Sequence, residues 1–108
     1  MNIGQIAKMA QQMQTQMAQA QEELKETTLE ATAGGGAVRI VITGAQEVRS
    51  VEIDPSAVDP EEVEMLQDLV MTAINEAIGR SKELERERMS RIAGGMGLPG
   101  MPGLPGFG

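Results

Sequence analysis

The side chains able to do chemistry in this chain are of few types. The 108 residues include no His, Cys, Tyr or Trp, and the single Phe is Phe107. Thiol nucleophiles, imidazole bases, disulfides and His/Cys zinc sites are therefore excluded within one chain. Catalysis would fall to Asp, Glu, Lys, Arg, Ser or Thr alone. We predict that the protein is not an enzyme and needs no cofactor.

The densest group of possible metal ligands is acidic and comprises Asp54, Asp59, Glu61, Glu62 and Glu64. Carboxylates can hold a divalent cation. The same residues also fit the start of a helix, because Asp59 is a good N-cap, a proline follows it at the first helical position, and acids suit the positive end of the helix dipole. Capping explains the group more simply, so we expect no metal site.

Three consecutive glycines, Gly34, Gly35 and Gly36, are a possible phosphate cradle. A phosphate-binding loop of the P-loop kind would be followed by Lys, then Ser or Thr, and by a long helix, and none of these follows here. Glycine adopts positive φ angles at little cost, so the triplet predicts a turn.

Basic residues are concentrated near the end of the chain. Residues 80–91 hold five bases against three acids, whereas residues 47–76 hold nine acids and one base, in a chain of net charge −7. Two interpretations remain open. The basic segment binds a polyanion, or it is a solvated helix face on which Arg pairs with Glu at spacings of three and four, as in Glu83 with Arg86 and Glu87 with Arg91.

Two long helices and three strands must position these residues. Residues 3–26 are rich in Gln, Met, Ala and Glu and predict a first helix, whose apolar residues repeat every seven positions. This repeat fits either a coiled-coil seam or the core face of one helix. A second helix of roughly 32 residues, from Pro60, should bury Val63, Leu66, Leu69, Val70, Ala73, Ile74, Ala77 and Ile78.

The middle of the chain alternates in the manner of strands. Residues 28–33, 37–43 and 47–53 predict three strands, the last two joined as a hairpin through Gly44. In the third strand, strict alternation places Arg49, Val51 and Ile53 on one face and Val48 on the other. We expect an α+β fold over residues 1–93 and a flexible Gly/Pro-rich tail over residues 94–108, with docking of its apolar residues on a protein partner as the alternative.

The predicted helices are too long for a compact monomer. A 93-residue globule has a diameter of about 32 Å, whereas helices of 24 and 32 residues span about 36 and 48 Å. With almost no aromatic residues the core would be thin, so we predict a homodimer with projecting helical arms. The expected interface residues are the large apolar ones of both helices, namely Met13, Met17, Leu24, Leu66, Leu69, Val70 and Ile74.

The sequence contains no apolar run long enough for a membrane span, and its polar, Gln-rich start lacks the apolar block of a signal peptide. We therefore expect a cytoplasmic protein without a membrane partner or a small-molecule substrate.

Several stretches together resemble the YbaB/EbfC family of bacterial nucleoid-associated proteins. The order of the matching segments is 11–14, 38–44, 51–56, 65–70, 73–77 and the Gly-Gly-Met-Gly-Leu-Pro-Gly of 94–100. The resemblance spans nearly the whole chain, and its most specific part is the strand ending in Ile53-Asp54-Pro55 followed by the helix from Leu66 to Ala77. It implies a tight homodimer whose helical arms bind double-stranded DNA in the nucleoid without catalysis.

By the same resemblance, the contacts with DNA fall on basic residues of both helices: Lys8, Arg80, Lys82, Arg86, Arg88 and Arg91. Phosphate contacts of this kind set affinity and salt dependence but specify no sequence. The first helix departs from this pattern, since Lys8 is its only base before Lys25. The alternative function is a dimeric adaptor that binds another protein through its Met-rich groove and its tail.

Overall fold

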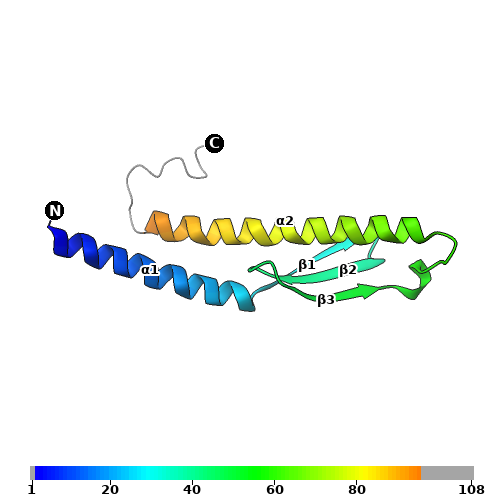
Figure 1. The fold of residues 1–108 in the computed structure, drawn as a ribbon, viewed down its shortest axis with the longest axis horizontal. Coiled ribbons are helices and arrows are strands. Elements are labelled where there is room, and N and C mark those ends of the chain that lie inside the picture. Colours follow the sequence, from blue (N-terminus) through cyan, green and yellow to red (C-terminus); the bar gives the residue numbers. More distant parts are fainter. Residues whose placement is uncertain (1, 96–108) are drawn as a thin grey trace, which may run out of the picture.

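The structure, a computed structural model, describes residues 2–95 and shows two long helices joined by a three-stranded sheet (Figure 1). The elements in chain order are α1 (Ile3–Glu26), β1 (Thr28–Ala33), β2 (Val38–Thr43), β3 (Val48–Ile53), a 3₁₀ turn η1 (Pro55–Ala57) and α2 (Val63–Gly95). This order confirms the predicted α+β fold. The first two glycines of the predicted tail belong to α2, and residues 96–108 lie outside the described residues.

The first helix begins and ends at local signals. The side chain of Asn2 accepts a hydrogen bond from the backbone N–H of Gln5 at 2.7 Å and so caps the first turn. At the other end, Thr27 leaves the helical conformation, and its hydroxyl donates to the carbonyl of Glu23 at 2.8 Å. The chain then enters β1 directly, so the sheet fixes the direction of α1.

The sheet is antiparallel in the order β1, β2, β3. Gly34, Gly35 and Gly36, which join β1 to β2, all have positive φ angles of 65°, 67° and 97°, so the predicted turn is confirmed. Ala31 pairs with Ile40, and Ile40 pairs with Val51, so the apolar residues of neighbouring strands share one face.

A β-bulge changes the face of one residue. Val41 pairs with Ser50 but Ile42 pairs with Val48, so Arg49 is an extra residue in β3. The prediction from strict alternation is therefore wrong for Val48, which lies on the same face as Val51 and Ile53.

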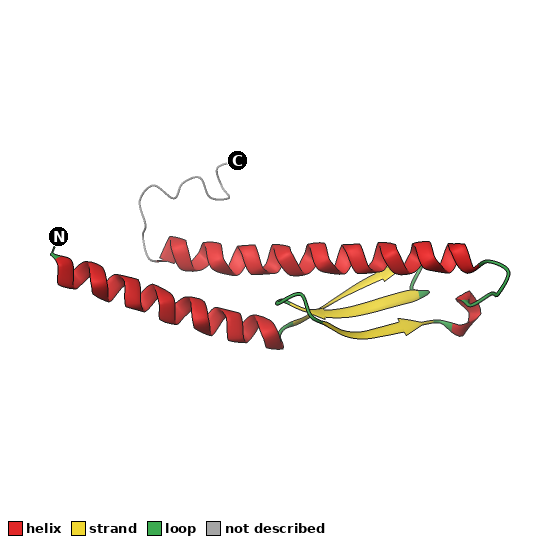
Figure 2. Ribbon diagram, viewed as in Figure 1, coloured by secondary structure: helices red, strands yellow, loops and turns green. Residues whose placement is uncertain are grey.

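The core lies between one face of the sheet and α2 (Figure 2). Val38, Ile40 and Ile42 of β2 are fully buried against Ala73 and Ala77 of α2. Alanines at these two positions let the helix axis approach the strands closely. The predicted apolar stripe of α2 is confirmed from Leu66 to Ile78, but Val63 is exposed, because α2 begins there rather than at Pro60.

The late start of α2 has a local cause. The carboxylate of Asp59 accepts a hydrogen bond from the N–H of Glu61 at 2.9 Å, and the carbonyl of Asp59 accepts from the N–H of Glu62. Asp59 thus closes a turn of its own, and the prediction that it is the N-cap is wrong. Asp54 acts in the same way, since its carboxylate accepts hydrogen bonds from the backbone N–H and from the hydroxyl of Ser56. These two hydrogen bonds lower the pKa of Asp54.

The molecule is elongated, with extents of 69 × 28 × 16 Å. We call residues 20–81, which contain the sheet and the core, the body. Residues 3–19 and 82–95 are the α1 arm and the α2 arm, and both lie at the same end of the molecule (Figure 1). Within residues 2–95, neither helix combines the length and the apolar character needed to cross a bilayer.

Candidate nucleic-acid interface

Charge is divided between the body and the arms. The body holds thirteen of the sixteen acids and only four bases. The α1 arm has Lys8 and no acid, and the α2 arm has four bases and three acids. Because both arms lie at the same end of the molecule, the electrostatic field changes along the long axis, from an anionic body to a weakly cationic end.

Two of the six predicted contact residues are held within the chain. The guanidinium of Arg80 donates to the carbonyl of Glu30 at 2.9 Å and pairs with Glu76 at 3.1 Å, so Arg80 anchors α2 to β1. Arg88 reaches Glu23 of α1 at 3.9 Å and is the least exposed of the arm bases. These two arginines contribute to the cationic field but are less free to move toward a ligand.

The other four predicted residues are accessible. Arg86 and Arg91 are paired with Glu83 and Glu87 of the same helix, yet both guanidinium side chains are 69% exposed. Such surface pairs contribute little stability, so a phosphate can replace the carboxylate at small cost. Lys8 and Lys82 form no ion pair with any described residue.

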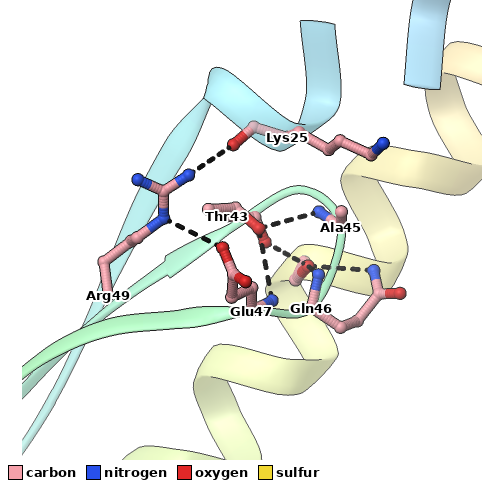
Figure 3. A network of polar contacts seen from close by, with 7 residues as sticks. Lys25, Thr43, Ala45, Gln46, Glu47 and Arg49 are labelled. Atoms are coloured by element: carbon pink, nitrogen blue, oxygen red, sulfur yellow. Dashed lines mark hydrogen bonds and ion pairs between the residues drawn. The ribbon is translucent and has the colours of Figure 1, made fainter. Parts of the chain in front are cut away.

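A polar network fixes the place where the arms leave the body (Figure 3). The hydroxyl of Ser81, fully buried in α2, donates to the carbonyl of Thr43 at 2.6 Å. The same hydroxyl accepts from the backbone N–H of Gln46 at 3.1 Å and from its side-chain amide at 3.0 Å. The turn between β2 and β3 is thereby attached to α2.

The same turn also holds the end of α1. The N–H of Gly44 donates to the carbonyls of Leu24 and Thr27, both at 2.9 Å. Arg49 donates to the carbonyl of Lys25 at 3.0 Å (Figure 3). We call residues 43–47 the junction turn. Because it contacts both helices, it sets the position of one arm relative to the other.

Residue types and spacing do not predict this junction. Ser81 lies in a charged segment and is predicted to be solvated, and its partners are 35 and 38 residues away in the chain. Gln46, which has a φ of 61°, is not a residue type that indicates a left-handed conformation.

We expect Gly44→Ala to destabilise the protein by about 1–3 kcal/mol, because the added Cβ would lie 2.7 Å from Leu24 Cδ2 and 3.1 Å from the Leu24 carbonyl oxygen. Gly79→Ala is the control, since its Cβ meets no atom within 4 Å and should stabilise α2 by about 0.5–1 kcal/mol. Urea unfolding measures both. Equal effects of the two substitutions would contradict the packing described at Gly44.

The apolar residues predicted for a dimer interface lie in four places. Leu24 is 1% exposed and is a core residue of the single chain, as the contact with Gly44 requires. Met13 and Met17 lie on the α1 arm. Leu69 is half-buried, and its side chain approaches Gly34. The remaining residues, Leu66, Val70 and Ile74, line a shallow apolar groove on α2 together with Gln67, Met71 and Asn75.

Other apolar residues are exposed on β3. Arg80 reaches β1 from one flank of α2, and the groove lies on the opposite flank, toward β3. All six residues of β3 are exposed, and Val51 and Ile53 are on the sheet face that α2 only partly covers. We call Val51, Ile53, Leu66, Val70, Met71 and Ile74 the body face. The opposite sheet face is polar, with Arg39 paired to Glu30 at 2.8 Å and to Glu52 at 3.6 Å.

The acidic residues of the body are spread over its surface. In the part of the chain that the structure describes, no three Asp or Glu side chains come together as ligands of one ion. With thirteen acids and four bases, the body offers a repulsive surface to a polyanion.

Known proteins match the chain over almost all of its length. The model of the family described as the YbaB/EbfC DNA-binding family matches residues 1–96. A nucleoid-associated protein of Acetivibrio thermocellus is 50% identical over 96 residues, which cover 89% of this chain and 85% of the relative. A nucleoid-associated protein of Chloroflexus aurantiacus is 51% identical over 96 residues, which cover 89% of this chain and 96% of the relative. The fold is also similar to the crystal structure of an uncharacterized protein from Helicobacter pylori, with a TM-score of 0.77 and 25% sequence identity. The match covers 85% of this chain and 97% of that one.

Proposed function

The chain belongs to the YbaB/EbfC DNA-binding family, and on that premise we propose that it is a nucleoid-associated protein that binds duplex DNA as a homodimer. The two arms of each chain make the contacts, and the protein organises DNA or influences gene expression without catalysing a reaction. The observation that carries this proposal is the separation of charge along the molecule.

The charge distribution favours one way of approaching DNA. A duplex that met the body would face thirteen carboxylates, whereas at the arms it meets five bases and three acids. Lys82, Arg86 and Arg91 can pair with phosphates and release condensed counterions. Such contacts carry no sequence information, so broad sequence tolerance follows.

The body face supports the homodimer. Val51, Ile53 and Met71 are exposed apolar residues, the groove of α2 lies on the flank toward β3, and an exposed apolar surface marks an interaction site. A second copy can cover the body face around a two-fold axis, because the same apolar patch of each chain then meets its counterpart on the other chain. With the body faces joined, the arms of both chains stay free.

An adaptor function is the second candidate. Ile3, Ile6 and Met9 are exposed on the α1 arm, and Ile3 has the largest exposed fraction, 83%. These residues fit a protein ligand better than a nucleic acid. Apolar binding would persist as the salt concentration rises, whereas phosphate binding would weaken.

Fluorescence anisotropy with two unrelated duplexes of equal length tests the proposed function. We expect the two dissociation constants to agree within about threefold, because phosphates are the same in both. We also expect affinity to fall steeply between about 50 and 200 mM salt. No binding of either duplex at the lowest salt concentration would contradict the proposal.

A further inference from the structure

The α1 arm carries an unusual polar stripe. Lys8, Gln11, Gln12, Thr15 and Gln19 are separated by three, one, three and four residues, so they lie on one side of α1. All five are exposed. The stripe lies opposite Leu24, one of the two buried residues by which α1 packs on the body. The stripe is therefore directed away from the core.

The stripe is also free of negative charge and of internal contacts. None of the sixteen acids precedes Glu22, which occupies the next position in the same series and is paired with Lys25 at 3.3 Å. The side chains of Gln11, Gln12 and Gln19 make no hydrogen bond to another residue within 2–95. Their amide groups are available to a ligand.

We infer that this stripe binds the sugar-phosphate backbone of duplex DNA through neutral hydrogen bonds, while the α2 arm binds it through charge. The inference rests on the proposed function and deepens it. A glutamine amide has two N–H donors that fit phosphate oxygens, and the absence of carboxylates removes the repulsion that such an approach would meet elsewhere on the chain. Lys8 adds one charge at the end of the stripe.

Neutral hydrogen bonds and ion pairs differ in their response to salt. A lysine or arginine that neutralises a phosphate releases a counterion and steepens the fall of log K with log salt, whereas an amide releases none. Removing the amides should therefore lower affinity by the same factor at every salt concentration.

The test compares two glutamine-to-alanine variants of the full chain. Gln11→Ala/Gln12→Ala/Gln19→Ala removes the amides of the stripe without changing charge. Gln14→Ala/Gln21→Ala removes exposed amides from a side of the same helix that the stripe does not occupy and is the control. Alanine keeps a high helix propensity, and circular dichroism checks that both variants fold.

We expect the stripe variant to bind duplex DNA about tenfold more weakly than wild type at each salt concentration, with an unchanged salt slope, and the control to bind as wild type does. Equal affinities of wild type and the stripe variant would overturn the inference alone, and so would an equal loss in the control. Failure of the wild type to bind would instead overturn the proposed function.

Discussion

Replacing Lys82, Arg86 and Arg91 by Gln is expected to weaken binding of duplex DNA by about hundredfold at about 0.1 M salt. The three side chains are exposed on the α2 arm, and none of them forms an ion pair with another described element. A dimer would lose six potential phosphate contacts, and each lost contact should reduce the salt slope by about 0.9. Fluorescence anisotropy over a series of salt concentrations measures both quantities.

The matched control replaces Lys25, Arg39 and Arg49 by Gln. These bases lie in the body, each paired with a carboxylate, and the charge change is the same. We expect this variant to lose much less affinity than the arm variant. If the two triple variants lose affinity equally, net charge rather than the α2 arm controls binding, and the proposed contacts are wrong.

The second large effect is expected at the body face. Val51→Glu/Met71→Glu introduces four carboxylates into an interface between two chains, and buried unpaired charges are strongly unfavourable. Both residues are about half exposed in the single chain, at 49% and 56%, so the fold should tolerate them. We expect the double variant to be monomeric at micromolar concentration and to bind DNA at least about tenfold more weakly, since only one pair of arms then meets each duplex.

Sedimentation velocity and circular dichroism test this prediction together. Thr32→Glu/Ser50→Glu is the control, because it adds the same charges to exposed positions on the opposite sheet face. This control should remain dimeric. A dimer of unchanged affinity in the Val51/Met71 variant would exclude the body face as the interface.

Local patterns were sufficient to predict most of the fold. Both long helices, the three strands and the glycine turn follow from residue type and spacing within a few positions along the chain. Two errors arose where a single residue departed from the regular pattern. Asp59 closes its own turn, which delays α2 to Val63, and the bulge at Arg49 moves Val48 to the other face.

The candidate site was less predictable than the fold. Charge composition located the basic segment, but it did not show that Arg80 and Arg88 are held by Glu30 and Glu23, which are distant in the chain. The seven-residue repeat of the first helix likewise did not show that Leu24 is buried within the chain while Met17 stays exposed. These distinctions depend on tertiary contacts that spacing alone does not encode.

Sedimentation velocity of a short fluorescent duplex with excess protein tests the central claim most directly. If two chains associate through their body faces and bind one duplex through their arms, the smallest complex contains two chains and one duplex. Raising the salt concentration should dissociate the DNA and leave the protein dimeric. A complex containing a single chain, or protein that sediments as a monomer without DNA, would contradict the account.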